Sequence, residues 1–258
     1  MRLSFALALI SLIAFSACKP SNTANSNAAN ANAKTVNVEP PKPIAPTTGP
    51  EPGFKSCNPY FPLVPGGRLR YLLTYSSGLL ADATVVIDRL EENGKKLLLE
   101  RTQIVDRSGG LQINQDTERH FECDGDRIKV LTETVKSIVS NSESSSQSNY
   151  RENSIFFPET SALSTKGFTW TYVFHPTYAS PGNPTSTSAE PIIVKLEIQG
   201  EADVTVPAGT FKAIKIQRKV NQNVSWDYVV KGIGLVKREA QEGTKWELRE
   251  YSGLNQSN

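Results

Sequence analysis

Three cysteines and two histidines are the residues of this chain best suited to nucleophilic or metal chemistry. Zinc sites and redox motifs usually place a second cysteine two residues away, and neither Cys57 nor Cys123 has such a neighbour. His120 and His175 are isolated in the sequence, and isolated histidines are usually solvated or hydrogen-bonded bystanders. We therefore expect no metal site.

Two pairs of carboxylates could bind a cation or act as general acid and base: Asp124 with Asp126, and Glu91 with Glu92. Both pairs stand in predicted turns, where acidic residues are common. The sequence has no Gly-x-Ser-x-Gly, no P-loop, no His-Glu-x-x-His and no Cys-x-x-Cys string. We expect no catalytic residue, no cofactor and no enzymatic activity, and we rank a hydrolase using paired carboxylates last among the hypotheses.

The third cysteine, Cys18, follows a secretory signal. Arg2 precedes an apolar run over residues 3–17, which is too short to span a bilayer. The string Phe15-Ser16-Ala17-Cys18 resembles the lipobox of bacterial lipoprotein precursors. This resemblance implies cleavage after residue 17 and a mature protein held on a membrane by acyl chains, such as palmitate, on Cys18.

The alternative is ordinary secretion with cleavage after Ser16, because Ala14 and Ser16 satisfy the small-x-small rule. That route leaves Cys18 as a free thiol and an odd cysteine count, whereas lipidation leaves an even pair. Residues 18–52, rich in Asn, Ala, Ser and Pro, are typical of a disordered tether. As a coil, the tether would reach about 30 to 35 Å.

Cys57 and Cys123 both stand in turn-rich surroundings of an exported chain. We expect a disulfide between them that joins the start of the folded domain to the end of a hairpin. The predicted organisation is therefore a signal peptide at 1–17, a lipid-anchored tether at 18–52 and one domain at 53–258.

The domain shows period-two patterning, which predicts β-strands. Leu69, Tyr71 and Leu73 alternate with residues that include Arg68, Arg70 and Thr74, and Asn93-Gly94 supplies a hairpin turn to the next run. Ten to twelve such runs occur, with no helix longer than a turn or two outside the signal. We predict an all-β fold, a single antiparallel sheet curved into a barrel or half-barrel, with polar loops at 141–149 and 176–188.

An internal duplication is one interpretation of two similar segments. Residues 60–62 and Gly67 precede one strand, while residues 157–158 and Gly167 precede another about one hundred residues later. The alternative is that many strands begin with aromatic, Pro and Gly residues. A duplication would favour two meander halves of one sheet.

Alternating aromatic residues provide the feature most open to a functional interpretation. They would line a pocket for an acyl chain if the curved sheet encloses a cavity, and otherwise they fill the core, as aromatic residues of β-domains usually do. The residues are Trp170, Tyr172, Phe174, Trp226 and Tyr228.

Charge argues against nucleic acid as a partner. From residue 53 onward, 24 basic residues balance 24 acidic residues, so the domain has no net charge.

The stretch from Gly200 to Ile216, containing Val204-Thr205-Val206-Pro207-Ala208-Gly209, resembles a pattern of bacterial envelope proteins of the DUF3108-like group, as does Gly232-Ile233-Gly234-Leu235 further on. The resemblance implies an antiparallel sheet curved into a barrel or half-barrel, and it carries no catalytic residue across. In physical terms the motif is a hairpin and a strand pair with glycines at the turns.

Together these observations favour a non-enzymatic envelope lipoprotein that binds a lipid-like ligand or an envelope protein. The alternative is an assembly component that pairs with a partner through a sheet edge. Lys19 is not the aspartate that resembles an inner-membrane retention signal. We therefore expect the outer membrane, with the domain facing the periplasm.

Overall fold

The computed structural model describes residues 43–47, 54–92, 94–107, 113–139, 142–150, 154–180 and 183–254. The predicted signal peptide, Cys18 and most of the predicted tether lie outside these residues. No helix in the described part of the chain is long and apolar enough to cross a membrane.

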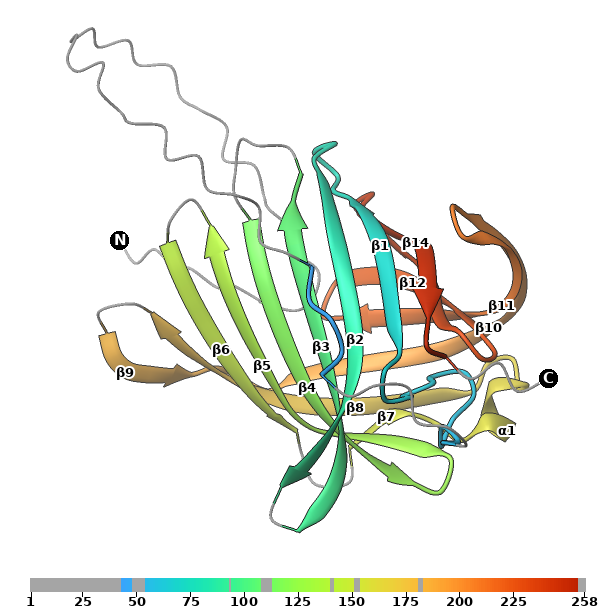
Figure 1. Cartoon of the computed structure of the whole chain (residues 1–258), viewed down its shortest axis with the longest axis horizontal. Helices are drawn as coiled ribbons and strands as arrows, with labels where there is room; N and C mark the ends of the chain where they lie inside the picture. The colour runs from blue at the N-terminus through green and yellow to red at the C-terminus, as the bar shows by residue number, and fades with distance from the viewer. Residues whose placement is uncertain are drawn as a thin grey trace, which may run out of the picture. The chain divides into compact units, whose positions relative to one another are not determined.

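Fourteen strands and one four-residue helix make up the described domain (Figure 1). In chain order they are β1 (Arg68–Thr74), β2 (Leu80–Glu92), β3 (Lys95–Asp106), β4 (Ile113–Asp124), β5 (Arg127–Val139), β6 (Ser142–Tyr150), β7 (Ile155–Phe157), α1 (Thr160–Leu163), β8 (Thr169–Ser180), β9 (Asn183–Ser188), β10 (Ile192–Val206), β11 (Gly209–Val220), β12 (Asn223–Val230), β13 (Gly234–Ala240) and β14 (Lys245–Ser252).

The strands form one antiparallel sheet that closes into a barrel. Neighbours follow the order β10-β11-β12-β13-β14-β1-β2-β3-β4-β5-β6-β8, and the pairing of β8 with β10 completes the ring of twelve. Strand β9 pairs with β8 outside this ring, and the short β7 pairs with β5. The predicted all-β barrel is confirmed.

The period-two pattern places alternate residues inside. On β1, Leu69, Tyr71 and Leu73 are buried and the residues between them are partly exposed. The predicted turn at Gly94 has a φ of 74°, and Gly125 in the β4–β5 turn has a φ of 64°, a region that glycine occupies without strain.

Both predicted polar loops are wrong. Residues 142–150 form β6, which pairs with β5 on one side and β8 on the other, and residues up to Ser180 extend β8 before β9 begins. Serine-rich segments lack the apolar alternation that signals a strand, but the backbone ladders of two neighbours stabilise this one.

The barrel consists of two six-stranded meanders, β1–β6 and β8 with β10–β14, and the first strand of each pairs with the last of the other. Gly66 donates its N–H to Ile87 O (2.9 Å), and Gly167 does the same to Ile198 O (2.8 Å). Both glycines have φ near 84°. This correspondence favours a duplication, one of the two interpretations of the sequence, with Gly66 rather than Gly67 equivalent to Gly167.

One end of the barrel is occupied by an aromatic cluster and the disulfide. Phe61, Phe121, Phe156 and Phe157, here called the aromatic plug, have ring centroids 5.3 to 5.5 Å apart. The segment that carries Phe61 therefore packs against the segment that precedes β8, which brings together the two regions compared in the sequence.

The described part of the predicted tether, residues 43–47, lies on the outer face of β2 and β3. Ile44 N donates to Gln103 Oε1 (3.2 Å), and Thr47 N donates to Asp88 Oδ1 (2.6 Å). Arg101 donates to Ala45 O (3.0 Å). These contacts hold the chain to the barrel before the domain proper begins.

Candidate functional site

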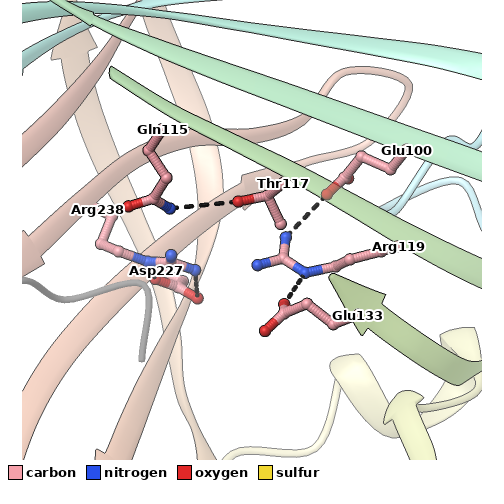
Figure 2. Close-up of polar contacts among 7 residues, drawn as sticks. All are labelled: Glu100, Gln115, Thr117, Arg119, Glu133, Asp227 and Arg238. Carbon is pink, nitrogen blue, oxygen red and sulfur yellow. Dashed lines mark hydrogen bonds and ion pairs between the residues drawn. The ribbon is translucent and has the colours of Figure 1, made fainter. Parts of the chain in front are cut away.

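The interior of the barrel carries a row of charged residues across three neighbouring strands. Glu100 on β3 lies opposite Arg119 on β4, which lies opposite Glu133 on β5. All three face inward because they are in phase with buried apolar residues such as Leu98. Figure 2 shows the three side chains meeting inside the sheet.

Arg119 forms ion pairs with both carboxylates. Its Nη1 donates to Glu100 Oε1 at 2.8 Å, and its Nε donates to Glu133 Oε2. Burial alone would lower the pKa of Arg119, but Glu133 and Glu100 raise it above its ordinary value. The guanidinium is therefore charged at every accessible pH and is held by both carboxylates.

A second ion pair lies inside the barrel on β12 and β13. The Arg238 guanidinium donates to both carboxylate oxygens of Asp227, at 2.5 and 2.7 Å. Burial opposes the charge of Arg238, and Asp227 outweighs it, so the pKa of Arg238 is raised. This pair and the Arg119 group face the same interior (Figure 2).

A third arginine, Arg218 on β11, also faces inward. Its guanidinium lies 5.9 Å from the ring centroid of Tyr172 on β8, within range of a cation–π contact. Burial raises the pKa of Tyr172 and raises that of Tyr150 more strongly. The three arginines and three carboxylates thus share an interior with buried phenols.

Farther from the aromatic plug, small side chains, many of them polar, line much of the interior beside larger residues such as Leu73 and Ile104. Gln115 Nε2 donates to Thr117 Oγ1 at 3.2 Å, which Figure 2 also shows. Other buried residues on the same face of their strands are Ala81, Ala83, Thr102, Ser137, Ser146, Ser148 and Ser225.

The structure divides the five predicted aromatic residues between the two faces of the sheet. Trp170, Tyr172 and Phe174 on β8 face the interior and are buried. Trp226 and Tyr228 flank the inward-facing Asp227, so alternation places them on the outer face.

On that outer face, Lys215 Nζ lies 5.5 Å from the ring centroids of both Trp226 and Tyr228. Tyr228 donates its hydroxyl to Glu239 Oε2 at 3.1 Å. The five residues therefore do not form one pocket lining or one core together, because the aromatic residues of β8 and β12 point to opposite faces of the sheet.

Cys57 and Cys123 form the predicted disulfide, with Cα atoms 6.1 Å apart. Beside it, the buried Asn58 side chain donates to Asp126 O (2.8 Å) and Pro158 O (2.9 Å), and its Oδ1 accepts from Tyr60 N (2.9 Å). The disulfide and Asn58 tie the segment before β1 to the β4–β5 turn and the segment before β8.

Of the acidic residues singled out in the sequence, Asp124, Asp126 and Glu92 have structural partners, and the partner of Glu92 is His120, at 3.3 Å. Asp124 forms ion pairs with Arg127 (2.7 Å) and Lys129 (3.0 Å), and the Asp126 carboxylate accepts from Thr160 N at 2.9 Å. Within the described residues, no group of three or more His, Cys, Asp and Glu side chains could hold a metal ion.

The sequence interpretation missed the interior charges. The signal was present at Glu100, which is in phase with Leu98 and Ile104 on the strand that follows the predicted turn at Gly94. A charged residue at a buried phase indicates an ion pair or a site, because a buried charge without a partner is costly.

Two solved structures resemble this chain. The first is described as a "putative lipoprotein" from Parabacteroides distasonis ATCC 8503, with 13% identity over 77% of this chain and 100% of the other, and a TM-score of 0.44. The second is described as a "putative exported protein" with a YmcC-like fold from Bacteroides fragilis NCTC 9343, with 11% identity over 72% and 95% of the two chains and a TM-score of 0.36.

A comparison with curated proteins found no match. The DUF3108-like family model matches residues 82–246, which is more than half of the chain and covers the strands from β2 to the start of β14. The resemblance seen in the motif from Gly200 to Leu235 therefore extends across both halves of the barrel, and the chain belongs to the DUF3108-like family.

Proposed function

We propose that this protein is a lipid-anchored component of the bacterial cell envelope that binds a small amphipathic molecule inside its barrel and catalyses no reaction. The observation that carries this proposal is the composition of the interior: ion-paired charges and small polar side chains occupy part of the inner face, beside the large apolar residues that would fill all of it in a closed apolar core.

Barrel size supports an interior site. Side chains fill the interior of an eight-stranded barrel, and the diameter grows with strand number, so twelve strands enclose more space. The walls away from the aromatic plug contribute Ala, Ser and Thr, for example Ala83, Thr102 and Ser148, together with some larger residues such as Leu73 and Ile104. Such walls favour a chamber that a ligand completes.

The charges favour binding over catalysis. A hydrolase of the glycosidase type needs a carboxylic acid and a carboxylate free to exchange protons with substrate. Glu100 and Glu133 instead share Arg119, and Asp227 is held by two hydrogen bonds from Arg238. Carboxylates held in this way position the arginine side chains and are not free to exchange protons with a substrate.

The anchor is the second part of the proposal. Lipidation of Cys18 would attach the barrel to a membrane through residues 19–42, and Lys19 favours the outer membrane with the barrel in the periplasm. Mass spectrometry of the N-terminal peptide of the mature protein tests this directly. A peptide beginning at Cys18 with acyl chains is expected, and an unmodified peptide beginning at Ala17 contradicts it.

Pairing with a partner through a sheet edge has less support. Closure of the ring gives each of the twelve barrel strands a neighbour on both sides, and the edges that remain in the described residues include the six-residue β9 and the end of β10 from Gln199 to Val206, which pairs only with β11. We therefore place the binding function in the interior.

A matched pair of substitutions on one strand tests the interior site. Ser148 faces inward opposite Glu133, and its neighbour Gln147 faces outward and is exposed. Each variant would be purified from the native host, checked for folding by circular dichroism and extracted with organic solvent. Wild type and Gln147→Trp should release the same amphiphile, and Ser148→Trp should release little. Equal release from all three, or none from wild type, contradicts the proposal.

A further inference from the structure

We propose that the Arg218 guanidinium, together with the Ser225 hydroxyl, binds the anionic group, a carboxylate or a phosphate, of the molecule held in the barrel. This inference rests on the proposed function and names the chemical class of its ligand.

Arg218 and Ser225 lie next to each other on the inner face of the barrel. Arg218 on β11 lies opposite Ser225 on β12 and opposite Leu196 on β10, so the three side chains share the inner face of the barrel. The exposed fractions of Arg218 and Ser225 are 9% and 1%. Both polar groups are therefore withdrawn from bulk water.

The charge of Arg218 is less well compensated than the charges of the other two interior arginines. Arg119 has two carboxylate partners and Arg238 has one, whereas in the described part of the chain no carboxylate forms an ion pair with Arg218. Its neighbour is the Tyr172 ring, a much weaker partner for a buried cation. A buried guanidinium without a counter-ion is costly, and an anion supplied by a ligand would remove that cost.

Arg218 and Ser225 each carry a hydrogen-bond donor that is not satisfied. Arg218 Nε and Ser225 Oγ are both buried and have no hydrogen-bond partner. They belong to directly opposed residues on neighbouring strands, so one acceptor group could reach both. Carboxylate and phosphate oxygens are the acceptors that a guanidinium binds most strongly.

The surroundings specify the rest of the ligand. Next to Arg218, β8 and β10 present an apolar wall in which Tyr172 lies opposite Val194 and Phe174 lies opposite Ile192. An apolar chain would lie against this wall while its anionic end meets Arg218. The ligand class is thus an anionic amphiphile, a fatty acid or a phosphate-bearing lipid.

The test uses the delipidated full-length mature protein and three single-chain probes: dodecanoate, dodecyl phosphate and the uncharged monododecanoylglycerol. At least one anionic probe should bind about tenfold or more tightly than the uncharged probe in calorimetric titration, as expected for a charge-assisted hydrogen bond. The tighter of the two anionic probes identifies the source of the anion.

Four variants locate the subsite. Arg218→Gln should abolish the preference for anionic probes, Arg218→Lys should retain part of it, and Ser225→Ala should weaken it. Arg249→Gln is the matched control, because Arg249 is exposed and pairs with Asp82 at 3.4 Å. It should bind like wild type.

Melting temperatures separate a ligand subsite from a structural role. Without ligand, Arg218→Gln should melt at or above the temperature of wild type, because it removes an uncompensated buried charge. An unfolded Arg218→Gln variant, or unchanged anionic preference in both Arg218→Gln and Ser225→Ala, overturns the inference.

The outcomes also distinguish this inference from the proposed function. Equal affinity for charged and uncharged probes would remove the anion subsite and leave interior binding intact, with only water between Arg218 and Ser225. Binding of none of the probes would count against both.

Discussion

Arg238 and Asp227 face each other across β13 and β12 inside the barrel, joined by two hydrogen bonds of 2.5 and 2.7 Å. In this pair one arginine has one carboxylate partner, and the other two interior arginines have a different number. Arg119 is shared by two carboxylates, and Arg218 pairs with no carboxylate of the described residues. In the described residues, the three interior arginines therefore differ in the number of carboxylates that hold them: two at Arg119, one at Arg238 and none at Arg218.

Replacing Arg119 by Met should destabilise the fold strongly. The substitution leaves Glu100 and Glu133 buried without their partner, and breaking a buried ion pair from one side costs about 3 to 5 kcal/mol. Urea unfolding measures the change. Arg249→Gln, on the surface, should change the free energy of unfolding by less than about 0.5 kcal/mol.

Neutralising the carboxylates should restore much of that loss. In the Arg119→Met background, adding Glu100→Gln and Glu133→Gln removes the unpaired charges, so the triple variant should be more stable than the single variant. A triple variant no more stable than Arg119→Met would mean that the arginine stabilises the barrel by packing alone.

Asn58 should be a large contributor to stability for its size. Its side chain makes three hydrogen bonds and is fully buried, so Asn58→Ala removes the partner of the buried Pro158 carbonyl and of the partly buried Tyr60 N–H and Asp126 carbonyl. We expect a loss of about 2 to 4 kcal/mol in denaturant unfolding. Asn223→Ala, at an exposed position, serves as the control, and equal effects of the two changes would refute this role.

The disulfide should stabilise the same end of the barrel. Cys57 and Cys123 are separated by 66 residues, and a loop of this size corresponds to about 2 to 5 kcal/mol. Denaturant unfolding of the oxidised protein and of the Cys57→Ser, Cys123→Ser variant provides the comparison. Coincident unfolding curves would contradict the prediction.

The strand pattern and the turns of the fold were predictable because each depends on local sequence. The alternation of Leu69, Tyr71 and Leu73 predicts an inward face of the strand, and Gly94 and Gly125 predict tight turns. The β6 strand was not predictable, because its serines carry no apolar period and its stability comes from neighbours on both sides.

The site was less predictable for a similar reason. The disulfide between Cys57 and Cys123 could be predicted because the expected lipidation of Cys18 leaves only these two cysteines. The partners of Arg119, in contrast, lie 14 and 19 residues away on two other strands. Their meeting depends on register, which a short sequence motif does not encode. The same register separates Trp226 from Trp170.

Alkaline pH should destabilise the folded state. Burial is the main cause of raised pKa values at five of the eight tyrosines, reaching about 12 at Tyr75 and Tyr228 and also raised at Tyr71, Tyr150 and Tyr172. Because the folded pKa exceeds the unfolded value near 10, their contribution to stability is complete below pH 10 and declines as the pH rises further.

Ultraviolet absorbance of tyrosinate checks this pH dependence. The native protein should titrate at higher pH than the same chain in denaturant, and the free energy of unfolding should fall above pH 10. Superimposable titrations in native buffer and denaturant would show that these phenols are not buried.

Native mass spectrometry of the full-length mature protein, purified in mild detergent from its own host, tests the central claim most directly. The account predicts an acylated protein that carries one additional small anionic molecule, released when Arg218 is replaced by Gln and retained when Arg249 is replaced by Gln. An acylated protein with no bound molecule in any preparation would contradict the claim that the barrel interior is a binding site.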